Sequence, residues 1–360
     1  MSKVIEDIRN KILYELHKMG FEINPHPHPA TSSKNGLKKL HVVRRLEILQ
    51  RYNEKLSEIT KIILKRYHNN VVIWDAINPK IIKVDADDEL YQIFLWFNIF
   101  WWSLPYERPV GRVIRYIIYD YGNDLPIGAV QLASPILKCK ARDEYLGINK
   151  ENRPYWVNQS LYGHRVGAFP PYHKIGANRL VAMSLASTDL RKLYIKKYKN
   201  RKSNFPNRVL FVTTFSGFGR STMYEDLWYK KIKLSYFIGF TKGSGTFHIP
   251  EKYLNLLRII AGKKRYKSSR KLYSVAKGLR LIGLNKFEYH GIKRAIYLFP
   301  HVKNLRDVIS NSAKPIWLNI KFSNMYKAWW DKSNHDIKKI TINVEVRDKY
   351  SLKWRFKTYS

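Results

Sequence analysis

The sequence predicts an α/β fold of the α+β kind, with a mixed sheet at its centre, helices before it and a basic extension after it. Three observations favour this class. Apolar runs typical of strands alternate with helical patterns between about residues 72 and 250. Glycine-rich turns follow three of these runs. The 360 residues are 45% hydrophobic and 14% aromatic, which supplies enough apolar surface for a sizeable core.

Three parts are expected along the chain: a helical, basic N-terminal segment (1–70), an α/β core (71–255) and a basic, aromatic-rich C-terminal region (256–360). In the first part, apolar residues recur at helical spacing until Gly20, which is expected to end the helix. Residues 38–67 repeat this pattern with a basic stripe beside the apolar one. That stripe is typical either of a solvated helix face or of a face that contacts phosphates.

The first elements of the core are an apolar helix and a hairpin. Residues 90–105 form the most apolar stretch, which is too short to span a membrane and predicts a buried helix. Residues 112–134 predict a β-hairpin that turns at Gly122-Asn123-Asp124. A helix is expected over 151–163.

The rest of the core alternates strands with glycine turns. Residues 165–199 predict a strand, a turn and one long helix, 208–217 a buried strand, and 236–249 two short strands. The turns HKIGAN, SGFGRS and TKGSG follow these strands. We expect the three turns to meet at one edge of the sheet and form a concave polar site.

The turns supply candidates for binding an anionic cofactor. Small residues before a helix let a phosphate approach the first backbone amides, and an arginine clamps a phosphate bidentately. The candidate cofactor-binding residues are Lys174, Gly176, Ala177, Asn178, Arg220 and Ser221.

Two residues are candidates for acid–base catalysis. Tyr224 follows the second turn and is a candidate general acid. Asp143 follows a strand and is a candidate general base, and the alternative is a structural ion pair with Arg142 or Arg165.

Positive charge dominates the composition. Lys and Arg number 66 against 28 Asp and Glu, a net charge of +38, and residues 251–360 hold 26 of these cations against 7 acids. Such an excess attracts a polyanion, above all nucleic acid, and the alternative is a Lys-rich surface without a partner. Cations alternate with aromatic residues over 262–280. The candidate nucleic-acid contacts are Arg165, Lys242, Lys263, Lys264, Arg265, Lys267 and Arg270.

Several classes of protein are excluded or disfavoured. A single cysteine, Cys139, rules out a disulfide framework and a Cys-rich zinc site, and no metal site is expected. The charged N-terminus carries no signal-peptide pattern, so a cytoplasmic protein without membrane contact is expected. Scarce carboxylates disfavour a two-metal nuclease.

The runs SLPYERPVGRVIRYIIYD, IGAVQLASPILKCKARDEYLGI, YGHRVGAFPPYHKIGANRLVAMSLAS, VTTFSGFGRSTMY and IGFTKGSGTFHIP resemble the DruA family of the Druantia anti-phage system, over about residues 100–250. The resemblance implies defence against foreign DNA, beside partners such as a large helicase. This chain has Gly176-Ala177 where the family usually has two glycines, and Thr213 where many members have Glu.

The order of the elements also resembles the acyltransferase fold of the GNAT superfamily. That resemblance implies an acyl-CoA-like donor whose pyrophosphate lies on the turn around Gly176, with Tyr224 protonating the leaving thiolate. Two hypotheses result. The chain is an enzyme that transfers a group to DNA, or it is a non-catalytic module, or a nuclease component, that recognises DNA and recruits an effector.

Overall fold

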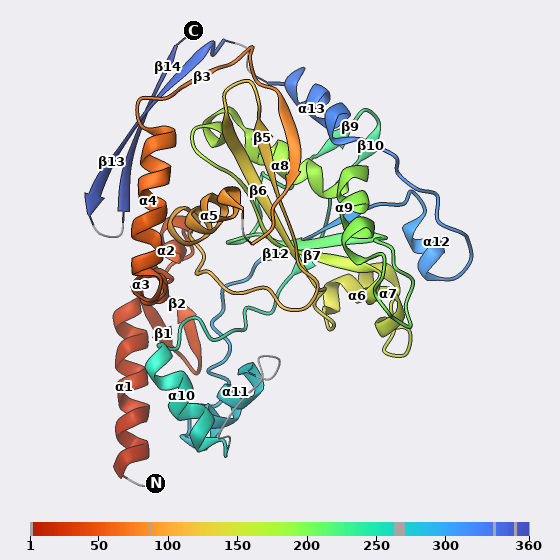
Figure 1. Ribbon diagram of the computed structural model, residues 1–360. Helices are drawn as coiled ribbons and strands as arrows, with labels where there is room; N and C mark the ends of the chain where they lie inside the picture. Colours follow the sequence, from red (N-terminus) through yellow and green to blue (C-terminus); the bar gives the residue numbers. More distant parts are fainter. Residues whose placement is uncertain (1–2, 87, 263–270, 334–335, 349–350, 360) are drawn as a thin grey trace.

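The computed structural model describes residues 3–86, 88–262, 271–333, 336–348 and 351–359. A seven-stranded mixed sheet lies at its centre (Figure 1), in the order β11-β12-β8-β7-β6-β5-β4, which confirms the α/β class. Its strands are β4 (Pro79–Lys83), β5 (Ile114–Asp120), β6 (Leu125–Ala133), β7 (Ser160–Ala168), β8 (Phe211–Phe215), β11 (Tyr236–Phe240) and β12 (Ala295–Pro300).

The directions of the strands place the glycine turns together. Strands β4 to β7 are antiparallel, and the expected hairpin is β5–β6. Strand β7 pairs with β8 in parallel, and β12 lies antiparallel between β8 and β11. Strands β7, β8 and β11 therefore run in the same direction, which confirms that the three turns leave the same edge of the sheet.

Helices cover the sheet. The expected apolar helix is present as α5, which continues into a π-helical turn, η1, and packs against α4. Helix α8 packs against β6 and β7, and α13 packs against α8 and β4. The bounds are α3 (Val42–Arg51), α4 (Asn53–Tyr67), α5 (Glu89–Trp96), η1 (Phe97–Trp101), α6 (Lys140–Leu146), α7 (Arg153–Asn158), η2 (Tyr172–Ile175), α8 (Ala177–Met183), η3 (Ser184–Ala186), α9 (Thr188–Tyr198), α12 (Leu305–Ile309) and α13 (Phe322–Trp330).

Three sequence predictions for this region are wrong. Of the two short strands expected over 236–249, only β11 forms, and residues 241–249 contain no further strand. The helix expected over 151–163 ends at Asn158, because Ser160 already begins β7. The single long helix expected within 165–199 is divided into α8, η3 and α9. Its break lies at Ser187, whose extended backbone and side chain cap α9 by accepting a hydrogen bond from the Leu190 amide at 3.2 Å.

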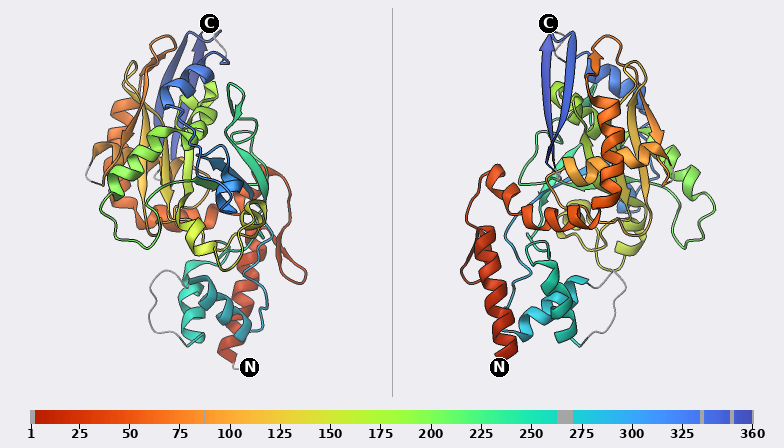
Figure 2. Two further views of the ribbon diagram at one scale, coloured as in Figure 1. Left: turned by 90° about the vertical axis from the view of Figure 1, so that its right-hand side faces the viewer. Right: turned by 60° about the vertical axis from the view of Figure 1, so that its left-hand side comes forward.

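A second hydrophobic core forms a helical lobe beside the sheet (Figure 2). It joins Ile12 and Leu16 of the first helix with Leu257, Leu279 and Phe287 from the segment between β11 and β12. Its elements are α1 (Lys3–Met19), β1 (Phe21–Ile23), β2 (Pro27–Pro29), α2 (Lys34–Lys39), α10 (Glu251–Ile260) and α11 (Lys271–Leu281). Gly20 ends α1 with a positive φ of 95°, as expected.

Residues of the C-terminal region contribute both to the helical lobe and to the central sheet. The expected boundary between residues 255 and 256 falls inside α10, and β12 completes the central sheet. A three-stranded sheet, with the order β14-β13-β3, lies alongside α4 (Figure 1). The remaining strands are β3 (Val71–Ile73), β9 (Trp228–Tyr229), β10 (Ile232–Lys233), β13 (Lys339–Asp348) and β14 (Ser351–Tyr359). None of the helices in the described ranges is long and apolar enough to cross a membrane.

Candidate functional site

The turns after β8 and β11 lie side by side. The Gly219 amide donates to the Lys293 carbonyl at 3.0 Å, and the Thr241 amide donates to the Arg294 carbonyl at 2.9 Å. Gly219 has a positive φ of 57°, a conformation that glycine adopts without strain. Both turns are therefore joined to the two residues that precede β12.

The turn after β7 reaches the second turn through Arg179. Its guanidinium donates to the carbonyls of Thr222, Glu225 and Asp226 at 2.9, 3.0 and 2.7 Å. The three glycine turns thus form one continuous edge, as the order of the strands predicted.

In the candidate cofactor-binding turn before α8, some residues already make contacts within the fold. Asn178 accepts a hydrogen bond from the Ala168 amide at 2.9 Å, and the side chain of Ala177 is buried. Gly176 has a positive φ of 77°, and a Cβ built there would meet nothing within 4 Å. The ammonium group of Lys174 lies 6.0 Å from the ring centre of Phe356. Space for a ligand therefore remains at Gly176, beside the C-terminal hairpin.

Arg220 and Ser221 also have partners within the chain. The Arg220 Nε pairs with the Glu225 carboxylate at 2.6 Å, and its guanidinium lies 4.7 Å from the Phe237 ring centre. The Ser221 amide donates to the Tyr297 hydroxyl at 3.0 Å, and that hydroxyl donates to Glu225 at 2.7 Å. A phosphate held by Arg220 would therefore compete with Glu225.

Tyr224 lies inside the protein. Only 5% of its surface is exposed, and its ring packs against Tyr297 and Phe299. Burial raises the pKa of its hydroxyl well above the ordinary value, so that this group stays protonated at neutral pH. An acid role for Tyr224 requires that a substrate reach this buried position.

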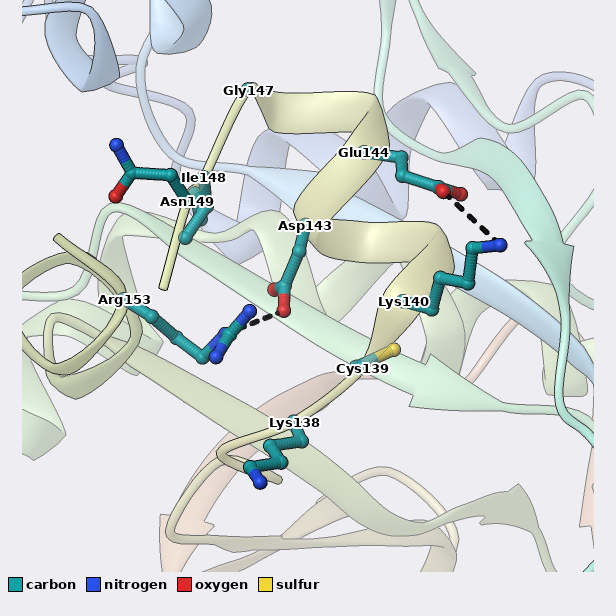
Figure 3. Close-up of a pocket in the computed structure, with 9 residues that line it drawn as sticks. All are labelled: Lys138, Cys139, Lys140, Asp143, Glu144, Gly147, Ile148, Asn149 and Arg153. Atoms are coloured by element: carbon teal, nitrogen blue, oxygen red, sulfur yellow. Dashed lines mark hydrogen bonds and ion pairs between the residues drawn. The ribbon is translucent and has the colours of Figure 1, made fainter. Parts of the chain in front are cut away.

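Asp143 lies on α6 and lines a pocket of about 450 Å³ (Figure 3). Arg142 donates to Asp143 Oδ1 at 2.6 and 2.9 Å, and Arg153 donates to Oδ2 at 2.8 Å. Both carboxylate oxygens are thus held by guanidinium groups, which is the structural arrangement that we weighed against a catalytic one. Arg165 is not the partner, because its guanidinium donates to the Pro105 carbonyl.

A second group of charges was not recognised as a unit from the sequence. We call Arg45, Arg165 and Arg294 the arginine cluster. They come from α3, from β7 and from the residue before β12, and each donates to a backbone carbonyl, of Phe100, Pro105 and Ser216 respectively. Within the part of the chain that the structure describes, no carboxylate lies within 4.0 Å of any of the three guanidinium groups.

The arginine cluster is positive and poorly solvated. Burial lowers the pKa of Arg165 to about 10 and also lowers the pKa of Arg45. The Nε atoms of both arginines are buried without a hydrogen-bond partner. Burial, followed by the positive charges of Arg294, Arg45 and Arg165, lowers the pKa of His41 to about 3. The histidine beside the cluster therefore stays neutral.

This arrangement suits an oxyanion. Guanidinium groups that lack a carboxylate offer N–H donors to a phosphate, and low local solvation strengthens such charge-assisted hydrogen bonds. The sequence named Arg165 alone. Arg45 could not be told apart from the other cations in the basic stripe of residues 38–67. Arg294 does not belong to a recognisable motif.

The other candidate contacts are less informative. Lys242 follows β11 and is exposed. The described ranges contain no group of three or more His, Cys, Asp or Glu residues that could hold a metal ion. Five candidates lie outside the described residues: Lys263, Lys264, Arg265, Lys267 and Arg270.

Two comparisons with known proteins agree. The family model described as Druantia protein DruA matches residues 31–311, which include the three turns, Asp143 and the arginine cluster. The Druantia protein DruA of Escherichia coli (strain UMEA 4076-1) is 29% identical over 234 residues. These residues are 63% of this chain but only 57% of that relative. No solved structure matches the chain, so the GNAT likeness is not confirmed by a known fold.

Proposed function

Because the chain belongs to the DruA family, we propose that it is a component of an anti-phage defence system and binds DNA there through the phosphates. The observation that carries this proposal is the arginine cluster, three cations without a carboxylate at the edge where the glycine turns meet.

The burial of Arg165 supports this role energetically. Only 8% of its surface is exposed, and the carboxylate that acts on it, that of the exposed Glu107, lies beyond ion-pair distance. A buried charge that is only partly compensated is costly. A bound phosphate would supply a closer negative charge and accept the free N–H groups. The charge of Arg165 would therefore be better compensated in the complex with DNA than in the free protein.

The composition supports a polyanion as the ligand. Even if each of the 28 acidic side chains neutralised one cation, 38 of the 66 cations would remain uncompensated. A field of this sign attracts DNA before any specific contact forms. We further propose that the bound chain recruits partner proteins of the defence system, of which a helicase is one candidate.

A buried arginine is tested by replacement with an apolar residue of similar size. Arg165→Met should leave the melting temperature unchanged or raise it, because the variant no longer buries an unpaired charge. The affinity for duplex DNA should fall about 10- to 100-fold, which corresponds to one lost charge-assisted hydrogen-bonding group. Fluorescence anisotropy at several salt concentrations measures both the affinity and its slope, which should decrease by about 0.9.

Arg191→Met is the matched control. Arg191 is also 8% exposed and donates to the Leu318 carbonyl at 2.8 Å, but it lies on α9 and is not part of the arginine cluster. This variant should bind DNA as the wild type does. Unchanged affinity and slope in Arg165→Met, or an equal loss in both variants, would contradict a phosphate site at the cluster.

Group transfer to DNA is a second candidate function, favoured by the pairing of β7 and β8. The two strands pair only through residues 160–163 and 211–214, so residues 164–168 of β7 have no partner in β8. A thioester donor of the acyl-CoA type would bind at the turn around Gly176. A base amine would then attack the thioester carbonyl and displace the thiolate, and Tyr224, which is protonated at neutral pH, would give the thiolate its proton. The proton released by the attacking amine would restore the Tyr224 hydroxyl.

Mass spectrometry of nucleosides tests this second function directly. Plasmid DNA from cells that express the wild type with its partner proteins should contain a new nucleoside mass, absent from cells with Tyr224→Phe. Unmodified DNA from cells with the wild type and from cells with Tyr224→Phe would contradict the transferase function and leave the DNA-binding function as the proposal.

A further inference from the structure

The C-terminal hairpin has two chemically different faces. Ile340, Ile342 and Val344 of β13 are each 1% exposed and face the core, so the residues between them face outward. Strand β14 alternates in the same way: Trp354 and Phe356 face inward, and Lys353, Arg355 and Lys357 are exposed.

The outward side of the hairpin, which we call the ribbon face, is strongly basic. Within 339–347 and 352–359 it carries one acid, Glu345, which forms an exposed pair with Arg355 at 3.4 Å. Exposed pairs of this kind contribute little to stability. The cations of the ribbon face are Lys339, Arg347, Lys353, Arg355 and Lys357.

Aromatic contacts hold the hairpin in place. The ring of Trp354 lies 5.3 Å from that of Tyr67 and 6.3 Å from that of Trp96, and Phe356 lies 5.6 Å from His173. At the end of the ribbon face, Lys339 and Lys357 lie 5.6 and 5.0 Å from the ring of Tyr359. The cations are therefore presented on a fixed scaffold, which lowers the entropy lost on binding.

The ribbon face also has a recess. It has a volume of about 340 Å³, and its lining includes Asn69, Asn70, Asn343, Arg355 and Lys357. The guanidinium group of Arg355 and the ammonium group of Lys357 offer donors to a phosphate oxygen. The buried side-chain oxygen of Asn343 has no partner, but it is an acceptor and does not itself favour a phosphate.

We propose that the ribbon face binds the phosphates of duplex DNA. The inference rests on the proposed function and names a second surface that contacts the same ligand. Alternate residues of a strand lie about 6.6–6.8 Å apart, so Lys353, Arg355 and Lys357 form a regular row of cations. Trp354 and Phe356 face inward, and the exposed ring of Tyr359 lies at one end of the row, so no run of rings follows the cations in the described part of the hairpin. This favours a duplex over a single strand, whose bases stack on successive rings. The hairpin lies beyond the residues 31–311 that the family model matches.

Neutralising the row tests the proposal in the full chain. The triple variant Lys353→Gln, Arg355→Gln, Lys357→Gln should bind a 20-base-pair duplex at least tenfold more weakly than the wild type, with the same melting temperature. The slope of log affinity against log salt should decrease by about 2–3, which is close to 0.9 for each lost phosphate contact.

A second triple variant controls for net charge. Lys192→Gln, Lys196→Gln and Lys199→Gln remove three exposed cations from α9 and its C-cap and should change the affinity and the slope much less. Equal losses in the two triple variants would overturn the ribbon face as a specific surface. So would an unchanged affinity in the first.

Two further outcomes separate this inference from the proposed function. Binding of the duplex by the wild type and by the ribbon variant, but not by Arg165→Met, would overturn the ribbon face alone. No binding of the duplex by the wild type would overturn both. A preference for single-stranded DNA or RNA that the ribbon variant loses would overturn the commitment to duplex DNA.

Discussion

Arg142 shows how this chain compensates a fully buried charge. Its side chain is 0% exposed and donates to the carbonyls of Ile136 and Leu137 at 2.6 and 2.8 Å. The Asp143 carboxylate supplies the negative charge, and Arg153 binds the other oxygen of the same group. Arg165 donates to the Pro105 carbonyl and feels the Glu107 carboxylate only from beyond ion-pair distance, and this contrast distinguishes it from the ion-paired Arg142.

Asp143→Asn should destabilise the protein strongly. The substitution leaves Arg142 buried without a counter-charge, a change that typically costs about 3–5 kcal/mol of unfolding free energy. Urea unfolding followed by circular dichroism measures this loss. Glu144→Gln, which breaks the exposed pair with Lys140 next to it, should cost less than about 0.5 kcal/mol. Similar stabilities of the two variants would show that the Asp143 pair is not structural.

Elements with a local signal were predictable from the sequence. The hairpin β5–β6, the apolar helix α5 and the buried strand β8 each have a periodicity or turn that defines them without distant contacts. The division of the long helix at Ser187 was not predicted, because the apolar pattern continues through the cap.

The hairpin β13–β14 shows a second limit of prediction from the sequence, which concerns the pairing of strands. Cations alternate with aromatic residues in KWRFK, a pattern that is typical of a basic surface. Its period of two also defines a strand, which places the cations on one face and the rings on the other. That consequence depends on a partner strand, and the sequence of β14 alone does not specify one.

At the scale of the whole molecule, contacts between distant segments decide the candidate site. The shared edge of the glycine turns was expected from the order of the elements, but the strand order was not predicted. The arginine cluster was not predicted either, because Arg45, Arg165 and Arg294 come from α3, from β7 and from the residue before β12 and approach one another only in the folded chain.

Buried histidines should make the whole fold sensitive to acid. Burial lowers the pKa of His301 to about 3 and that of His248 to about 4. In the unfolded chain these groups bind protons below about pH 6.5, and in the folded protein they do so only near pH 3–4. The unfolded state therefore gains protons first, and stability is lost as the pH falls from about 6.5 toward 4.

His301→Gln tests this sensitivity for one group. Between pH 6 and 4.5, the dependence of the unfolding free energy on pH should weaken by about 1.4 kcal/mol per pH unit, the effect of one proton. Identical pH profiles of the wild type and His301→Gln would contradict a buried neutral imidazole.

The insertion of β12 between β8 and β11 affects how the chain folds during synthesis. Strands β8 and β11 have both been synthesised by residue 240, but they do not pair with each other. Each pairs with β12, which is made of residues 295–300. The ribosome must therefore add the whole segment of the helical lobe before the sheet closes. Until then, two strand edges are unpaired, and such edges invite pairing with other chains. A helical lobe that forms early beside them would shield this half-built sheet from neighbouring nascent chains.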